Sequence, residues 1–174
     1  MEKVKIGFVG VGTMGQMAHL KHYATLPDCQ VVALAEIRPE LGKQVAAHYN
    51  VPHVYTDFET MLANEKLDGI VAIHGFNRHG ILLPELLKAG IPVLTEKPLA
   101  ASIAVGERIL ESLKKYGSWY MVAYHKRSDP ATMYVHQEIA RLKETGELGQ
   151  LKYVRILMPA GAWVWNGFFD LITT

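Results

Sequence analysis

The chain alternates short, continuous apolar runs with longer segments whose apolar residues recur every three or four positions. Continuous apolar runs are typical of parallel strands buried on both faces, whereas the wider spacing is typical of helices with one buried face. The apolar runs predict strands over residues 3–10, 30–36, 52–56, 69–74, 92–96 and 119–124.

Helical patterns lie between these runs, and several carry residues that favour helix ends. Asp57 and Ser102 are suitable N-caps, because their side-chain oxygens accept from the first free N–H groups. Gly117 suits the end of the helix that Ser102 begins. Pro84 lies inside another pattern, so that helix either begins late or is kinked. The predicted helices cover 14–25, 39–49, 57–63, 79–90, 102–117 and 130–146.

Repeated strand–helix alternation predicts an α/β fold with a doubly wound parallel sheet. We expect this dinucleotide-binding (Rossmann) type of domain to occupy residues 1–124. The region 125–174 is expected to hold a linker helix and, at 149–158, the first strand of a second, α+β domain. The apolar tail 160–174 is expected to be disordered or to pack against another copy of the chain.

The composition excludes several classes of protein. Of the 174 residues, 49% are hydrophobic and 20% charged, so a core can form and disorder is not expected. The net charge of +1 and the mixture of acids and bases argue against a nucleic-acid or membrane surface. Cys29 is the only cysteine, which rules out an intramolecular disulfide. No apolar run approaches the roughly 20 residues that span a bilayer, so we expect a soluble, cytoplasmic protein.

Residues 10–15 read GVGTMG and have the spacing G-x-G-x-x-G. This spacing is weak evidence alone, but here it follows a predicted strand and opens a predicted helix. Gly10 allows a tight turn, Gly12 lets the backbone approach a pyrophosphate, and Gly15 lets the helix pack close to the strand. Phosphates then bind free N–H groups at the helix N-terminus. The predicted phosphate-binding set is Gly10, Gly12, Thr13, Met14 and Gly15.

Glu36 ends the second predicted strand, where dinucleotide-binding domains carry an acidic residue. Its carboxylate can accept from both ribose hydroxyls of NAD and repels a 2′-phosphate. Arg38 favours the alternative cofactor, NADP, because a guanidinium can pair with that phosphate. We expect NAD, with NADP as the alternative; a glycine turn in a domain without nucleotide is the other alternative.

Polar residues also follow the later strands. Ligands of doubly wound sheets bind beyond the carboxyl ends of the strands, so these residues are candidates to face one crevice. They come from the segments HGFNRH (74–79), EKPLA (96–100) and HKRSDP (125–130). The candidates are His74, His79, Glu96, Lys97, His125 and Arg127.

Several of these segments together resemble the glucose-fructose oxidoreductase / inositol dehydrogenase family, often called Gfo/Idh/MocA. The resemblance runs from Lys3 to about Arg155, and the E-K-P element is its most specific part. It rests on GVGTMG, Glu36, TEKPLA (95–100), YHKRSDPA (124–131) and GELGQLKYVRI (146–156).

The resemblance implies an NAD(P)-dependent oxidoreductase that transfers hydride between nicotinamide and a hydroxyl carbon of a sugar or polyol. In that family the lysine matching Lys97 lies beside the nicotinamide, hydrogen-bonds the substrate oxygen and assists proton transfer. Pro98 there holds the loop shape, and Glu96 is expected to position the cofactor or the lysine. Without the resemblance, Lys97 reads equally well as a surface lysine paired with Glu96.

The chain also departs from the family. Where the family often has T-P-N-x-x-H, this sequence keeps only the final histidine, His79. His74 and Gly75 still lie near the expected nicotinamide ribose. Arg127 is the last of the predicted cofactor-binding residues. The family's second domain supplies a catalytic D-x-x-x-H pair, but Asp170 has Thr174 four positions on. We therefore expect an N-terminal cofactor portion that is inactive alone, from a homo-oligomeric enzyme. A non-catalytic dinucleotide sensor of the same fold is the alternative.

His19 and His22 lie three residues apart on the first predicted helix. A metal site needs further ligands, and the sequence offers none at a suitable spacing. We expect both histidines to be solvated on the surface and expect no metal.

Overall fold

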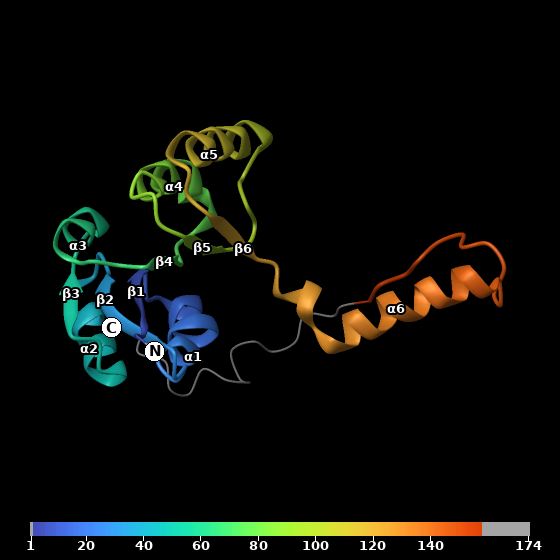
Figure 1. Cartoon of the computed structure of the whole chain (residues 1–174), viewed down its shortest axis with the longest axis horizontal. Coiled ribbons are helices and arrows are strands. Elements are labelled where there is room, and N and C mark those ends of the chain that lie inside the picture. The colour runs from blue at the N-terminus through green and yellow to red at the C-terminus, as the bar shows by residue number, and fades with distance from the viewer. Residues whose placement is uncertain (1, 158–174) are drawn as a thin grey trace. The chain divides into compact units, whose positions relative to one another are not determined.

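The computed structural model describes residues 2–157, of which residues 2–123 form one compact unit and residues 124–157 belong to a second. The first unit is built on a six-stranded sheet with the order β3-β2-β1-β4-β5-β6, and each neighbouring pair is parallel (Figure 1). The predicted doubly wound sheet is confirmed. The strands are β1 (Val4–Val9), β2 (Cys29–Ala35), β3 (His53–Tyr55), β4 (Gly69–Ala72), β5 (Val93–Glu96) and β6 (Tyr120–Ala123).

The helices of this unit lie where the periodicity predicts them. The first begins with a wide π-type segment, in which the Lys21 N–H reaches back to the Gln16 carbonyl. The helix with Pro84 does not begin late, because it starts at His79 and holds the proline inside it. The segments are η1 (Gly15–Leu20), α1 (Lys21–Tyr23), α2 (Pro39–Tyr49), α3 (Phe58–Asn64), η2 (Phe76–Arg78), α4 (His79–Leu87) and α5 (Ile103–Tyr116).

Helices cover both faces of the sheet (Figure 1), and an apolar cluster lies on each face. On one face, Met61 of α3, Leu86 of α4 and Ile109 of α5 pack against the strands. On the other face, Leu20 of η1 and Val45 of α2 do so. Because helices cover both faces, the strands are apolar on both sides, which explains their continuous apolar runs.

The predicted caps are present. The Asp57 carboxylate accepts from the Thr60 N–H at 2.7 Å, and the Ser102 hydroxyl accepts from the Val105 N–H at 3.3 Å. Gly117 ends α5 in a left-handed conformation with φ of +64°. These local contacts start and stop the helices at the boundaries read from the sequence.

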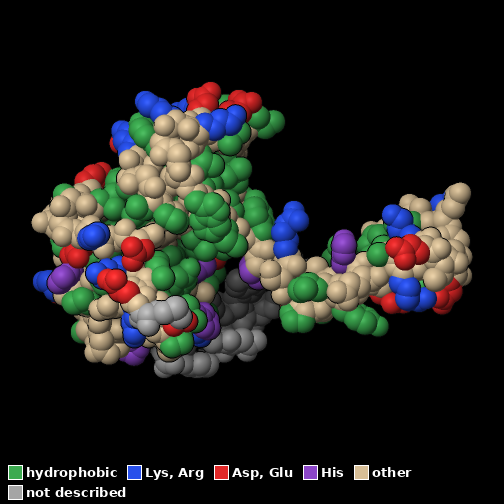
Figure 2. Space-filling model, viewed as in Figure 1, with side chains coloured by type: hydrophobic (Ala, Val, Ile, Leu, Met, Phe, Trp, Pro, Cys, Tyr) green, Lys and Arg blue, Asp and Glu red, His purple; other side chains and the backbone are tan. Residues whose placement is uncertain are grey.

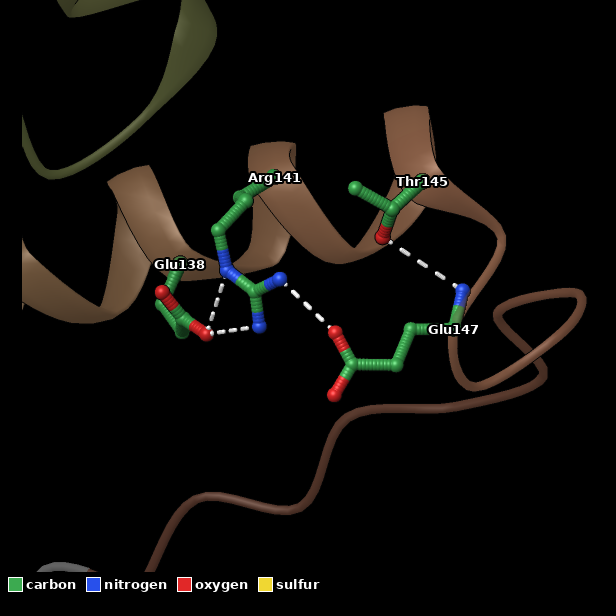
Figure 3. A network of polar contacts seen from close by, with 4 residues as sticks. All are labelled: Glu138, Arg141, Thr145 and Glu147. Carbon is green, nitrogen blue, oxygen red and sulfur yellow. Dashed lines mark hydrogen bonds and ion pairs between the residues drawn. The ribbon is translucent and has the colours of Figure 1, made fainter.

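The second unit holds the turn η3 (His125–Ser128) and the helix α6 (Pro130–Thr145). Asp129 caps α6 by accepting from the Ala131 and Thr132 N–H groups. At the other end, Arg141 pairs with both Glu138 and Glu147, and the Thr145 hydroxyl accepts from the Glu147 N–H (Figure 3). These contacts tie the last turn of α6 to the segment that follows.

The strand predicted over 149–158 is wrong in its described part, because residues 150–157 form no strand. A strand needs a neighbour for its backbone hydrogen bonds, and none of the other described segments pairs with this one. Its assignment to a second domain stays a prediction. The expectations for the tail 160–174, including Asp170, lie outside the described residues.

Several large apolar side chains of the first unit are exposed. They include Ile103 and Leu110 of α5, Trp119, and Met121 of the edge strand β6. Figure 2 shows apolar side chains gathered on the viewed face of this unit, with charged side chains around it. Within residues 2–157, no helix has the length and apolar character needed to cross a membrane.

Candidate functional site

The glycine loop joins β1 to the first helix and lies at the point where the strand order reverses, between β2 and β4. Gly10 has φ of +86°, and a Cβ there would lie 2.3 Å from the Ile73 carbonyl oxygen. A Cβ at Gly15 would lie 2.6 Å from the Gly10 carbonyl oxygen. Both positions therefore need glycine for the close approach of backbone to backbone.

Gly12 differs from these two glycines. The atom nearest to a Cβ built there is Nη2 of Arg38, at 3.5 Å, so the position faces open space instead of the protein core. Thr13 and Met14 follow it and are exposed, and the π segment that begins here has no side-chain cap. An uncapped helix N-terminus beside an open glycine can accept a phosphate group.

Glu36 lies at the end of β2 and is buried, with 4% of its surface exposed. One carboxylate oxygen accepts from the Val11 N–H at 3.0 Å, and the other accepts from Arg38 Nε at 2.8 Å. Burial alone raises the pKa of Glu36, but the hydrogen bonds from Arg38 and Val11 outweigh it and hold the pKa below its usual value. Glu36 is therefore a carboxylate at neutral pH, and it holds the glycine loop in place.

Arg38 lies between Glu36 and Gly12. Its side chain is about half exposed, and its guanidinium pairs with Glu36 while Nη2 lies over Gly12. The guanidinium is thus placed to meet the ribose or the phosphates of a bound dinucleotide.

A pocket of about 270 Å³ opens beside Gly10. The end of β2 contributes Ile37, the loop after β3 contributes Thr56, and the loop after β4 contributes His74 and Arg78. Its wall is mostly apolar with a few polar groups at the rim. Such a pocket suits a flat heteroaromatic ring.

His74 and His79 stack edge to face, with ring centroids 5.0 Å apart. His79 is fully buried, and its Nδ1 donates to the Leu99 carbonyl oxygen at 3.0 Å. Among the described residues, neither ring nitrogen of His74 nor Nε2 of His79 has a hydrogen-bond partner. Burial, together with the nearby His79 and Arg78, lowers the pKa of His74 to about 4, so this ring is neutral at physiological pH.

The E-K-P element follows β5. Glu96 is buried, and its carboxylate accepts from the Lys97 backbone N–H at 3.1 Å and contacts Nε2 of His19 at 2.8 Å. The Lys97 residue is exposed, and its peptide bond to Pro98 is cis. The alternative is a surface ion pair between Lys97 and Glu96. Among the described residues there is no such ion pair, and the Glu96 carboxylate contacts His19.

The prediction that His19 lies on the surface is wrong. His19 is 8% exposed and contacts Glu96, whereas His22 is exposed as expected. Residues 15, 16, 19 and 20 are buried, a spacing that lies on one face of a helix, so His19 belongs to the inward face of this segment. Across the described residues, no three His, Cys, Asp or Glu side chains gather as a metal site requires.

The remaining predicted site residues divide between the two units. Gly75 lies in the exposed loop after β4, next to His74. His125 and Arg127 lie in η3 of the second unit and are exposed. A role for Arg127 in cofactor binding stays a prediction.

Comparison with known proteins gives consistent matches. A family model described as an oxidoreductase family with an NAD-binding Rossmann fold matches residues 4–124. The trans-1,2-dihydrobenzene-1,2-diol dehydrogenase of Xenopus tropicalis is 32% identical over 136 residues, which are 76% of this chain and 39% of that protein. The inositol 2-dehydrogenase of Acidothermus cellulolyticus is 29% identical over 138 residues, covering 78% of this chain and 40% of that protein.

A solved structure shares the fold. The scyllo-inositol dehydrogenase from Lactobacillus casei, with bound cofactor NAD(H) and scyllo-inositol, superposes with a TM-score of 0.72 at 22% identity. The match covers 86% of this chain and 43% of that one. The chain therefore spans roughly two fifths of the length of the relatives it matches.

Replacing Gly10 by alanine should destabilise the first unit. The left-handed φ costs a side chain about 1–2 kcal/mol, and the overlap with Ile73 adds to it. The matched variant Gly12→Ala should keep the free energy of unfolding within about 0.5 kcal/mol of the wild type. Urea denaturation measures both, and equal stability of the two variants would contradict the assigned roles.

The neutral His74 should make the fold sensitive to acid. An unfolded His74 takes up a proton near pH 6.5, but the folded ring does not until about pH 4, so stability is lost as the pH falls through this interval. The wild type should lose up to roughly 3 kcal/mol more than His74→Asn between pH 7 and pH 4. Urea denaturation at both pH values tests this, and an identical pH dependence of the two proteins would show that His74 is not held neutral.

Proposed function

The chain belongs to the Gfo/Idh/MocA oxidoreductase family, and from that premise we propose that it is the NAD-holding part of a dehydrogenase. The proposed reaction moves a hydride between nicotinamide and a carbinol carbon of a sugar or polyol. Inositol is one such polyol, and it is named for relatives of this chain.

The observation that carries the proposal is the open approach to Gly12 beside the buried Glu36 carboxylate. At the other two glycines of the loop the protein backbone fills the space, whereas at Gly12 it leaves room. In this proposal the pyrophosphate lies over Gly12 and the N–H groups of Thr13 and Met14. The ribose next to the adenine then lies within reach of Glu36.

The pocket beside Gly10 is the proposed place of the adenine ring. Ile37 and Leu82 supply apolar wall, and Arg78 and Thr56 lie at its polar edge. His74, expected from the sequence near the nicotinamide ribose, borders this pocket, and in this proposal it faces the adenine instead. Its neutral imidazole can accept or donate a hydrogen bond without carrying charge. The His79 ring packs edge to face against His74, and its hydrogen bond to the Leu99 carbonyl oxygen fixes the His79 ring.

Glu36 and Arg38 decide between the two nicotinamide cofactors. The carboxylate accepts hydroxyl groups and repels a 2′-phosphate, and its lowered pKa keeps it charged. Arg38 offsets part of that repulsion, but it is already paired with Glu36. We therefore propose a preference for NAD, with measurable but weaker binding of NADP.

Lys97 is the proposed catalytic residue. When bound, nicotinamide supplies the hydride acceptor or donor. The exposed Lys97 side chain lies one residue beyond the carboxyl end of β5 and is available to donate a hydrogen bond to a carbinol oxygen and to exchange its proton. Glu96 binds the Lys97 backbone N–H, and none of the residues 2–157 forms an ion pair with the Lys97 ammonium group.

The substrate wall is proposed to come from a second domain, because the chain spans roughly two fifths of its relatives. The chain alone should then bind cofactor with little turnover. Cytoplasmic location and self-association are part of the same proposal. A non-catalytic dinucleotide sensor is the alternative, and the retained Glu96, Lys97 and Pro98 argue against it.

Fluorescence titration of this chain with NADH and NADPH tests the cofactor site. NADH should bind more tightly, and Glu36→Ala should weaken NADH roughly tenfold while bringing the two affinities together, because a hydrogen-bonded charge is lost. Glu40→Ala, an exposed acid that pairs with Lys43, is the control and should change neither affinity.

Two outcomes of that titration would contradict the assignment: tighter binding of NADPH by the wild type, or unchanged NADH affinity in Glu36→Ala. Because Glu36 also holds the Val11 N–H, Gly12→Ala provides a second variant. It should stay folded and weaken both dinucleotides, since its methyl group occupies the proposed pyrophosphate space.

The role of Lys97 is tested in a form of the protein that carries a complete second domain. Lys97→Ala should lower turnover by about 10²–10⁴-fold, the usual worth of acid–base assistance, with NADH affinity nearly unchanged. Lys114→Ala, an exposed lysine of α5, is the control. Full turnover in Lys97→Ala would show that the lysine has no part in the mechanism. If the wild type and the variants all bind NADH but none turns over substrate, the non-catalytic dinucleotide sensor would be favoured.

A further inference from the structure

A buried pair joins two elements of the proposed site, the helical segment η1 and the end of strand β5, that are far apart in the sequence. Nε2 of His19 and Oε1 of Glu96 lie 2.8 Å apart, and the side chains are 10% and 11% exposed. A carboxylate only accepts hydrogen bonds, so Nε2 of His19 is the donor. Buried polar groups are costly unless they are paired, so this contact holds both residues in one arrangement.

The His19 end of the pair belongs to the phosphate-binding element. His19 lies in η1, the helical segment that begins directly after the glycine loop. The same segment is tied to the loop by Gln16, whose side-chain amide donates to the Val11 carbonyl at 2.8 Å. Gln16 and His19 lie three residues apart on the buried face of this segment. A ligand that orders the glycine loop therefore also orders His19.

The Glu96 end is the last residue of β5, directly before the proposed catalytic Lys97. Oε1 contacts His19, and Oε2 accepts from the Lys97 backbone N–H at 3.1 Å. Strand β5 fixes the Glu96 backbone, since Glu96 is paired with Ala123 of β6. One carboxylate thus connects the helix that follows the glycine loop with the backbone from which the Lys97 side chain extends.

We propose that His19 is a positioning residue that couples dinucleotide binding to the placement of Lys97. The chain of contacts runs from Val11 through Gln16 and η1 to His19, and from there through Glu96 to Lys97. A dinucleotide that orders the glycine loop strengthens this chain, and an ordered Lys97 backbone in turn favours the dinucleotide, because coupling between two sites is reciprocal. The inference rests on the proposed function and adds to it a residue that touches neither cofactor nor substrate.

The rival explanation is that His19 only fills space under the first helix. Three variants separate the two. His19→Leu fills the space without a donor, His19→Gln keeps an N–H donor, and His22→Leu places the same apolar residue at an exposed position of the same helix. A space-filling role predicts that leucine is tolerated better than glutamine at residue 19, and a positioning role predicts the reverse.

The experiment measures two quantities in this chain. The first is NADH affinity by fluorescence titration, and the second is hydrogen exchange of the Lys97 amide by NMR, with and without NADH. His19→Leu should weaken NADH roughly fivefold or more and speed exchange of the Lys97 amide, while its urea denaturation confirms that it is folded. His19→Gln should keep the NADH affinity and the exchange rate of the Lys97 amide close to the wild-type values. His22→Leu should leave both quantities as in the wild type.

A double-mutant cycle with Glu96→Gln completes the test. If the pair transmits the coupling, the loss of NADH affinity in the double variant is smaller than the sum of the two single losses. Additive losses, an unchanged Lys97 amide in His19→Leu, or failure of His19→Gln to restore both quantities would overturn the proposal. If the wild type binds no dinucleotide, the proposed function fails; faster Lys97 exchange in His19→Leu then still supports the positioning contact, and unchanged exchange overturns it.

Discussion

The approach of the Gly10 backbone to the end of β4 is the constraint on which the rest of the site depends. The Gly10 N–H donates to the Ala35 carbonyl at 2.8 Å, and the Ile73 N–H donates to the Val9 carbonyl at 2.7 Å. These bonds hold the end of β1 between its two neighbours, so close that no side chain fits at Gly10. The crevice, the direction of the first helix and the open face of Gly12 all follow from this contact, because parallel strands present their carboxyl ends to one edge of the sheet.

Two buried carboxylates then connect the loops around that edge. Glu36 joins the end of β2 to the glycine loop through Val11, and Glu96 joins the end of β5 to the first helix through His19. Each uses its two oxygens on different partners, so each fixes two backbone segments with one side chain. A carboxylate in such a place stays charged only if its hydrogen bonds outweigh the cost of burial, as the lowered pKa of Glu36 shows.

The loop after β4 carries a histidine pair that departs from the pattern of the family. Where relatives of this family often have T-P-N, this chain places His74 against His79, and the resulting pair has polar atoms that no described residue satisfies. Unsatisfied buried polar atoms are rare in folded proteins and often mark functional positions. His74 borders the pocket proposed for the adenine ring, where a neutral imidazole costs less than a charged group.

The sequence by itself determined the fold class, the strand and helix positions, the caps at Asp57 and Ser102, and the three glycines of the loop, because each depends on local periodicity or on backbone freedom at a single residue. It also pointed to Glu36 and Lys97, because strand ends converge in a parallel sheet. Only the tertiary structure decided that His19 is buried against Glu96, since a partner 77 positions away is not a local property. The same holds for residues 150–157, the described part of the strand expected at 149–158, because a strand exists only where a neighbour completes its hydrogen bonds.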